Sequence, residues 1–375
     1  MEENNNSNKY KYLITALICT AVVLAVGICV IVLSADLEPA YAQNSNEASL
    51  EETLSDAASD ETETTQAATE TECQAVGSLS LEEISSTSSV YIEDGTTYVV
   101  KNIDTIETEL TDGQDSGNSN YVIYVNLAWN VVTVCSTDDS GTETPVRAFY
   151  CSAALDGVTT PTGEFELDQW YEWCSLMDGS YGHYAYRLTG DEEVTHILFH
   201  SVPYLSMSED TLEWEEYNKL GTNASMGCIR VSASDARWLC ENAGSGSKVV
   251  IYSDESSAGP INAVSTCFIP EVVTQICGWD PTDPSADNPW LSYTFTLETP
   301  DEITVSAGDK LDITALVSAT DIYGNDISAY ASYTCDGSSV DGSVAFYEVG
   351  VHTLAVSVSA GLVTAGRTIT VTVTE

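Results

Sequence analysis

Basic residues are scarce in this sequence. Eleven Lys and Arg stand against 58 Asp and Glu, the formal net charge is −47 at pH 7, and no basic residue occurs between Lys11 and Lys101. Because binding to nucleic-acid phosphates needs clustered Lys and Arg, this composition excludes nucleic acid as a partner. A charge of one sign also keeps a protein soluble and repels anionic polymers.

Histidine is scarce as well, which limits the catalytic bases. The four are His183, His196, His200 and His352. His196 and His200 are four positions apart, but the stretch reads as a strand and has no carboxylate between them as a zinc-protease helix does. We therefore expect no metal and no cofactor. His352 stands alone among predicted strands, which indicates a structural role, and His183 is interpreted as structural or as part of a cleft rim.

One long apolar run lies near the N-terminus. Leu13 to Leu33 comprises 21 residues without a charge, enough for a helix to cross a hydrocarbon core of ~30 Å. Lys9 and Lys11 precede it, so residues 1–12 are expected in the cytoplasm and the rest outside the cell membrane. The alternative is a cleaved signal peptide, because Ala40 to Ala42 resembles a cleavage site, and the protein would then be secreted.

An acidic, low-complexity segment follows over residues 34–90. Few aromatic residues and one charge sign predict a disordered tether. Residues 91–120 are read as a hairpin and linker, with Asp94-Gly95 at the hairpin turn. The stretch TDGQDSGNSN at 111–120 is a predicted loop.

Short β-branched and aromatic stretches dominate residues 121–252 and predict a mostly β domain. The segments YVIYVN, NVVTVCS, VRAFYCS, THILFHSV and KVVIY read as strands. Ser232 to Asp235 carries a capping signal for a short helix that Gly244 is expected to close. Residues 253–290, rich in Ser, Pro and Asp, read as a linker. Over 291–375, strands alternate with Gly and Asp turns, which favours an immunoglobulin-like β-sandwich.

The eleven cysteines include two, Cys19 and Cys29, in the apolar run. Nine remain, so in an oxidising compartment one thiol stays unpaired or pairs between chains, and a catalytic cysteine would account for it. The pairs considered are Cys135–Cys151, Cys174–Cys240 and Cys267–Cys277, although a sequence does not determine connectivity.

Cys228 has the surroundings of a nucleophile. It follows Gly227, where backbone can approach a substrate closely. The cation of Arg230, two residues on, is expected to lower the pKa of the thiol. A thiolate near a histidine attacks peptide carbonyls, and the N–H groups around Gly227 and Cys228 are placed to stabilise an oxyanion.

The segments FHSVPY (199–204) and SMGCIR (225–230) together resemble the signature of the YkuD-type L,D-transpeptidase catalytic domain. His200 matches the first histidine of that family, and Ser225, Gly227, Cys228 and Arg230 match its second motif. NVVTV, PVRAFYCSAA and TPTGEF are similar too, so the resemblance covers about 121–252. It implies a mostly β fold, a YkuD-like β-sandwich with short helices.

The resemblance also implies a reaction on peptidoglycan stem peptides. Cys228 would form a thioester at the third residue of a donor stem, D-Ala would leave protonated by His200, and an amine would then give a 3→3 cross-link. Water as acceptor would make the enzyme an L,D-carboxypeptidase. The Ser201 carbonyl would orient the imidazole. Arg230 would contact substrate carboxylate, with Ser225 and Tyr204 as further substrate contacts and Tyr184 as a candidate for the cleft wall.

Two departures from the family pattern keep other functions open. Met226 stands where the family has histidine, and a thioether cannot donate a hydrogen bond. An insert, SMSEDTLEWEEYNKLG, lengthens the spacer after His200 and is interpreted as a lid or a substrate wall. A catalytically weak or inactive wall-binding protein is therefore one alternative. A sortase-like transpeptidase is another, although sortases carry Thr-Leu-x-Thr-Cys.

Overall fold

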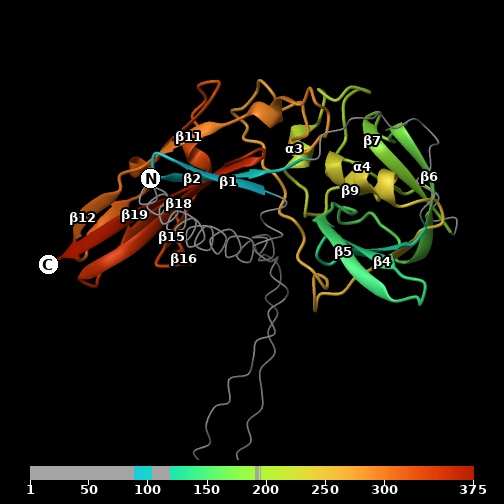
Figure 1. The fold of residues 1–375 in the computed structure, drawn as a ribbon, viewed down its shortest axis with the longest axis horizontal. Coiled ribbons are helices and arrows are strands. Elements are labelled where there is room, and N and C mark those ends of the chain that lie inside the picture. The colour runs from blue at the N-terminus through green and yellow to red at the C-terminus, as the bar shows by residue number, and fades with distance from the viewer. Residues whose placement is uncertain (1–87, 104–118, 191–193, 195) are drawn as a thin grey trace, which may run out of the picture.

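The computed structural model describes residues 88–103, 119–190, 194 and 196–375. The predicted apolar helix over 13–33 and most of the acidic segment lie outside them. Within the described ranges, no helix is long and apolar enough to cross a membrane. These residues are mostly β, as expected, with only two short α-helices among them, and they form two bodies that lie side by side (Figure 1).

The first body contains an eight-stranded mixed sheet in the order β5-β4-β3-β10-β6-β7-β8-β9. The predicted strands at 121–126 and 248–252 form here and pair in parallel. The bounds of the eight strands are β3 (Tyr121–Asn126), β4 (Val131–Thr137), β5 (Glu143–Tyr150), β6 (Gly163–Ser175), β7 (Tyr181–Thr189), β8 (Leu198–Ser201), β9 (Ile229–Val231) and β10 (Lys248–Tyr252).

Strands β6 and β7 are the longest of this sheet and pair with each other antiparallel. In β6, Phe165 and Leu167 are buried, while the preceding Glu164 and Glu166 are exposed. This alternation is typical of an antiparallel strand with one face in water. The register shifts between Leu167 and Trp170. Through β7, this pair joins the rest of the sheet to β8 and β9.

Two helices flank this sheet, α3 (Trp214–Tyr217) and α4 (Ala233–Asn242). The predicted cap of α4 is confirmed, because the Ser232 hydroxyl accepts a hydrogen bond from Asp235 N at 3.2 Å. The predicted end is wrong in detail. The helix ends at Asn242 with an extended Ala243 as its cap, so Gly244 does not supply a left-handed cap.

The second body is built around a seven-stranded sheet in the order β1-β2-β19-β18-β15-β16, with β12 also paired to β19. Two further pairs, β11–β14 and β13–β17, complete it. An immunoglobulin-like assignment stays a prediction. The bounds are β1 (Ser88–Glu93), β2 (Thr96–Lys101), β11 (Phe295–Glu298), β12 (Glu302–Ser306), β13 (Lys310–Asp312), β14 (Ser318–Asp321), β15 (Ala331–Cys335), β16 (Ser338–Ser339), β17 (Ser343–Ala345), β18 (Gly350–Ala360) and β19 (Val363–Thr374).

The predicted hairpin turn at Asp94-Gly95 is confirmed. Both residues have positive φ (46° and 77°), and Glu93 pairs with Thr96 across the turn, as expected of a two-residue hairpin. The hairpin joins the second body, because β2 pairs antiparallel with β19, and Figure 1 shows it beside the C-terminal strands. The eight-stranded body is thus inserted in sequence between two parts of one sheet.

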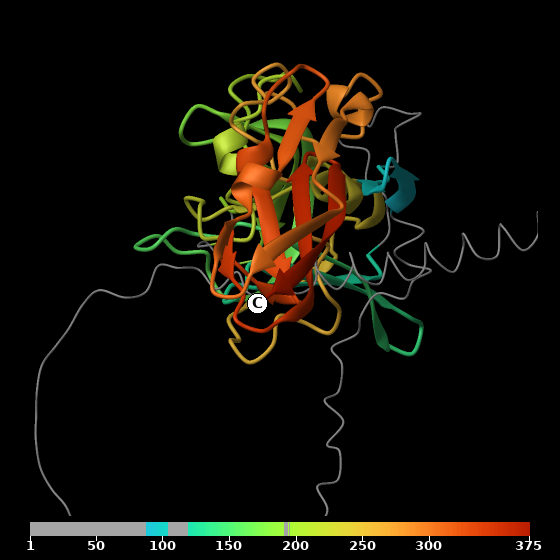
Figure 2. The ribbon, with the colours of Figure 1, turned by 90° about the vertical axis from the view of Figure 1, so that its left-hand side faces the viewer.

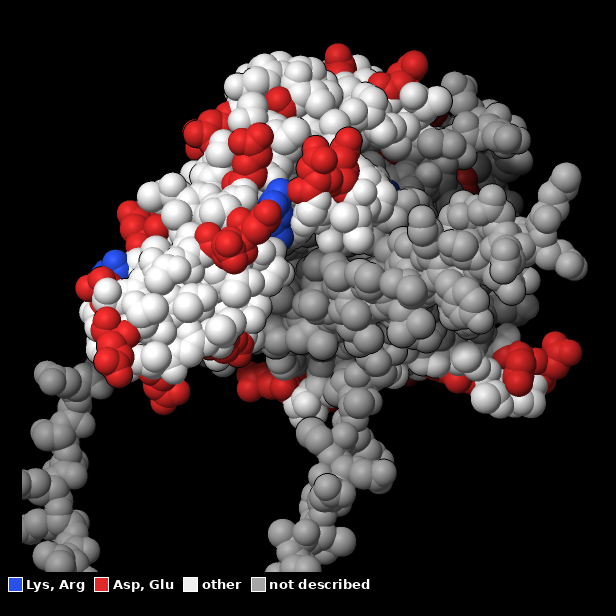
Figure 3. Space-filling view, turned by 60° about the vertical axis from the view of Figure 1, so that its left-hand side comes forward, with Lys and Arg blue, Asp and Glu red and all other residues white. Residues whose placement is uncertain are grey.

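Residues 267–297 connect the bodies and contribute to their packing. Cys267, Ile269, Val273 and Trp290 are buried in one apolar cluster with Leu354 of β18 and with side chains from 202–220. The second apolar cluster lies within the eight-stranded body. The two bodies therefore share a continuous packed region, and Figure 2 shows the C-terminal strands in front of the first body. Acidic side chains outnumber basic ones on the face of the second body in Figure 3.

Candidate active site

The predicted base lies on β8, and the predicted nucleophile directly precedes the neighbouring edge strand, β9. These strands run parallel, with His200 paired to Arg230 and Phe199 to Ile229. Paired side chains share a face of a sheet, and so do residues two apart along a strand. Arg230 therefore lies on the same face as His200, and Cys228 lies in the bend that leads into β9, two residues before Arg230.

His200 is buried and has its orientation fixed. The residue is only 1% exposed, and its Nδ1 lies 2.5 Å from the Ser201 carbonyl oxygen. A carbonyl only accepts, so Nδ1 carries the proton and Nε2 keeps its lone pair. Burial, together with the nearby Arg230 cation, lowers the pKa of His200 to about 4. The imidazole is therefore neutral at pH 7 and able to take a proton. The orienting role expected for Ser201 matches this contact.

Gly182 on β7 provides the space for the imidazole. A Cβ at this position would lie 2.8–2.9 Å from Cβ, Cγ and Nδ1 of His200. These atoms form the base of the side chain, and the bond to Ser201 prevents the ring from turning away. Any larger residue at 182 would therefore displace the base.

Cys228 is half-buried, and its Sγ lies 4.0 Å from the His196 carbonyl oxygen. Burial raises the pKa of the thiol, while a backbone hydrogen bond from Leu198 and the Arg230 cation act in the opposite direction. The expected effect of Arg230 has the right sign but is smaller than the cost of burying a thiolate. A thiol with a raised pKa needs a base to become a nucleophile, and His200 on the neighbouring strand β8 is the predicted base.

The loop before Cys228 uses its polar groups internally. The Ser225 hydroxyl donates to the Cys228 carbonyl at 2.6 Å and accepts from Gly227 N at 3.0 Å. Gly227 has φ +125°, and a Cβ there would lie 3.2 Å from Ile197 and from the Thr159 carbonyl. The predicted oxyanion donor at Gly227 N and the predicted substrate contact at Ser225 are therefore engaged inside the loop. Met226 between them is 61% exposed.

Arg230 is buried against the insert. Its Nη1 donates to Glu216 Oε2 at 2.7 Å and to the Ala224 carbonyl at 3.0 Å. Glu216, on α3, also pairs with Lys219. The sequence predicted that Arg230 contacts a substrate carboxylate. In the structure, Arg230 pairs with the carboxylate of Glu216 instead. A Glu in an insert between two catalytic motifs was the signal that sequence reasoning missed.

The insert is held by the second body. Leu212, Tyr217 and Leu220 are buried in the apolar cluster that the bodies share, and Leu212 N donates to the Gly278 carbonyl at 2.7 Å. Tyr204, predicted to line the cleft, is fully buried, and Tyr184 is nearly so. Neither forms an open wall in this structure, because aromatic stacking around His183 encloses both.

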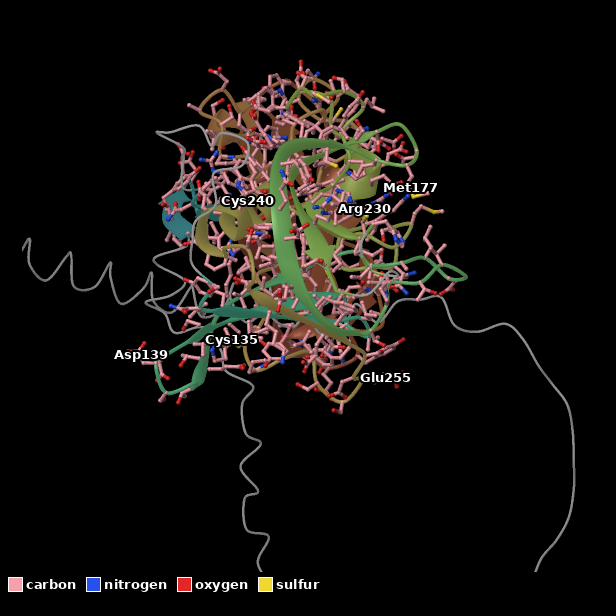
Figure 4. All side chains as sticks on the ribbon, turned by 90° about the vertical axis from the view of Figure 1, so that its right-hand side faces the viewer. Cys135, Asp139, Met177, Arg230, Cys240 and Glu255 are labelled. Atoms are coloured by element: carbon pink, nitrogen blue, oxygen red, sulfur yellow. The ribbon has the colours of Figure 1, made fainter. Side chains whose placement is uncertain are left out.

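Met177 and Asp178 form the β6–β7 turn near this site. The Asp178 carboxylate acts electrostatically on Cys228, His200 and Arg230. Met177 is 91% exposed. Figure 4 shows Met177 and Arg230 toward the same end of the body, away from Cys135 and Asp139. The rim of the site is thus both apolar and acidic.

The cysteines of the described residues are all free thiols. None of the three pairs considered from the sequence is formed, so the argument from an odd number of cysteines is not supported. Cys151 and Cys240 are buried, and burial raises the pKa of both, that of Cys151 to about 12. Within the described ranges, no group of three His, Cys, Asp or Glu is placed to hold a metal ion.

Comparison with known proteins agrees with this geometry. Residues 120–251 match the family model of the YkuD L,D-transpeptidase catalytic domain. A putative L,D-transpeptidase, YciB, of Bacillus subtilis (strain 168) is 35% identical over 107 residues, which cover 27% of this chain and 52% of that protein. The chain thus spans about half the length of this curated relative.

Two solved structures are also similar. An L,D-transpeptidase in complex with imipenem is 22% identical, covering 41% of this chain and 67% of that chain, with a TM-score of 0.28. A fused Zn-dependent amidase/peptidase/peptidoglycan-binding domain-containing protein of Clostridium acetobutylicum is 20% identical, covering 37% and 56%, with a TM-score of 0.28. The resemblance expected from the two motifs is confirmed for residues 120–251, which match the YkuD-type L,D-transpeptidase catalytic domain.

Proposed function

We propose that this protein is a peptidoglycan L,D-transpeptidase that forms 3→3 cross-links through a thioester on Cys228. The observation that supports the proposal is the parallel pairing of β8 with β9, because it holds a neutral, oriented His200 beside the strand that Cys228 directly precedes. Both residues lie in the region that matches the L,D-transpeptidase catalytic domain.

The reaction follows from the protonation states at the site. As Sγ of Cys228 attacks the carbonyl of the third stem residue, Nε2 of His200 takes the thiol proton. The C–N bond to D-Ala then breaks, and His200 returns that proton to the leaving amine, which gives the thioester. An acceptor amine attacks the thioester, passes its proton to His200, and the thiol is restored. Holding base and nucleophile in place before reaction supplies much of the rate.

Stabilisation of the oxyanion falls to a backbone N–H group. Gly227 N already donates to Ser225, so the donor to the oxyanion is Cys228 N. Met226 provides no donor where the family has histidine, and it is exposed beside the nucleophile. This residue motivates the second candidate, a wall-binding protein of weak or no activity. Transfer to water, as in an L,D-carboxypeptidase, uses the same residues.

The location is part of the proposal. The charge-free run over 13–33, with lysines only on its N-terminal side, supports a single-pass anchor with both bodies outside the cell membrane. Cleavage near Ala42 would release the same two bodies.

A mass-spectrometric assay of the full-length chain with a disaccharide-tetrapeptide tests the function. A cross-linked dimer that lacks one D-Ala, absent with Cys228→Ala and His200→Ala, is the expected product. Tripeptide alone would redirect the assignment to a carboxypeptidase. A folded protein that gives neither product nor a carbapenem adduct would leave the wall-binding protein as the function.

A further inference from the structure

A short segment outside the catalytic-domain match is buried against the eight-stranded body. Asp280 and Asp283 are fully buried and Thr282 is nearly so. Asp280 Oδ2 accepts from Ala233 N at 2.8 Å, and Thr282 Oγ1 accepts from Ser234 N at 3.3 Å. The segment therefore docks at the N-terminal end of α4, where unpaired backbone N–H groups need acceptors.

The segment is also braced internally. The Asn288 side chain donates to the carbonyl oxygens of Asp280 and Asp283 at 3.0 and 2.8 Å. Ser285 N donates to Asp283 Oδ1 at 2.9 Å. These bonds fix the Asp283 carboxylate and leave its second oxygen, Oδ2, directed toward the eight-stranded body.

That oxygen faces His183. Asp283 Oδ2 lies 3.7 Å from His183 Nδ1, and neither atom has a hydrogen-bond partner among the described residues. The imidazole is stacked between Trp173 and Tyr184, with ring centroids 3.9 and 3.7 Å away. Tyr184 reaches this position with a left-handed φ of 49°, which is unusual for a bulky residue. Since buried polar groups are costly unless paired, the two side chains are complementary to each other.

The backbone of His183 leads from this pair to the base. His183 N donates to Ser201 Oγ at 2.8 Å, and the Ser201 carbonyl accepts from His200 Nδ1 at 2.5 Å. The preceding residue, Gly182, is the one whose Cα faces the imidazole of His200. Movement of His183 would therefore shift both Ser201, which orients His200, and Gly182, against which the imidazole of His200 lies.

We propose that Asp283 is a positioning residue for His200 that acts through His183 and Ser201, so that a segment outside the catalytic-domain match completes the active site. The inference rests on the proposed function for its catalytic readout. It makes the segment at residues 280–288 a condition for full activity.

The test uses the full-length chain with Asp283→Asn, which keeps the size and the Oδ1 acceptor. Two assays are used. The first measures kcat and KM of cross-linking, and the second measures the rate at which iodoacetamide alkylates Cys228. We expect kcat and the alkylation rate to fall about tenfold, because small displacements of a catalytic group reduce rates steeply. KM is expected to stay within about twofold, since Asp283 touches no substrate.

A matched control is Asp321→Asn, a buried carboxylate of the second body that accepts from Tyr323 N and Asn325 N. This variant should lower the melting temperature and leave both rates unchanged. His183→Gln approaches the same contact from the other side, and its effect combined with Asp283→Asn should be no larger than either alone. If Asp283→Asn does not fold, His183→Gln and Ser201→Ala carry the test.

Wild-type rates in a folded Asp283→Asn or His183→Gln, or fully additive losses in the double variant, would overturn the inference. The alkylation readout separates it from the proposed function. Alkylation that depends on His200 without any cross-linked product would refute the transpeptidase, while the effect of Asp283 on alkylation would still decide its positioning role.

Discussion

The two bodies bury their polar groups in different ways. In the second body, β18 from Leu354 onward and β19 alternate buried apolar residues with more exposed Thr and Ser, so apolar burial stabilises the sheet. The eight-stranded body instead buries His183, His200 and Arg230. Buried polar groups cost stability unless each has a partner. Their concentration in one body indicates where the fold has been shaped for chemistry.

The largest expected effect comes from removing the thiol of the first body. Cys228→Ala should reduce cross-linking by on the order of 10³-fold or more, because the variant lacks the thiol that is proposed to form the thioester. Cys240→Ala, which removes a buried thiol of the same body, is the control and should keep the activity. Intact mass after carbapenem treatment measures both. An adduct on the Cys228 variant would assign the nucleophile elsewhere.

Removing the base is the next largest change. His200→Gln keeps a polar side chain but has no group that can take the thiol proton, and general-base catalysis contributes at least about 10²-fold. The expected result is a fall of that size in kcat with little change in KM. His352→Gln in the second body, where the histidine pairs with Asp336 at the surface, should leave kcat unchanged. Equal losses in both variants would contradict the division between the bodies.

Acid affects the buried histidine of the first body in a defined pH range. Burial lowers the pKa of His200 to about 4, so kcat/KM should halve only near pH 4 rather than near 6.5. The unfolded chain binds this proton near 6.5. His200 therefore contributes stability above pH 6.5 that is lost as pH falls toward 4, on the order of 3 kcal/mol.

Urea unfolding of the wild type and His200→Gln at several pH values measures this contribution. Asp280 works in the opposite direction, because burial raises its pKa to about 7 and its contribution is lost as pH rises toward that value. The difference between the two proteins isolates His200. A pH-independent difference would show that the histidine is not held neutral.

The smallest effect on catalysis is expected from the core of the second body. Leu354 is fully buried on β18, and Leu354→Ala should lower the free energy of unfolding by about 2–5 kcal/mol. At a temperature where the variant is folded, kcat/KM should equal that of the wild type. A large loss of activity in this folded variant would mean that the whole second body, and not only Asp283, tunes the site.

Local patterns in the sequence predicted the local features of the fold. The turn at Asp94-Gly95 and the strand at 248–252 follow from residue type and alternation. The pairing of β2 with β19 has no such signal, because its partners are far apart in the chain. Strands β6 and β7 were not predicted, and in β6 acidic residues alternate with the apolar ones.

The residues of the candidate site show the same difference between local motifs and distant contacts. Cys228 and His200 were found because each lies in a short motif. Glu216, Asp283 and Gly182 act through contacts between segments that are distant in the chain, and only the folded structure shows these contacts. The hydrogen bonds that Ser225 and Gly227 make within their own loop are likewise visible only in the folded structure.

The insertion of the eight-stranded body within the sheet of the second body sets an order of events during synthesis. Arg367 donates to the Asp94 carbonyl, 273 positions away, so the hairpin is made long before the strand that it pairs with. Forming such distant contacts is slow because a long loop must close first. All strands of the eight-stranded body are synthesised before β19, so this body can fold while β1 and β2 still lack their partner strand. During that interval the unpaired edge of the hairpin is exposed to other chains. Pairing with the last strand, β19, covers this edge and removes the risk of aggregation there.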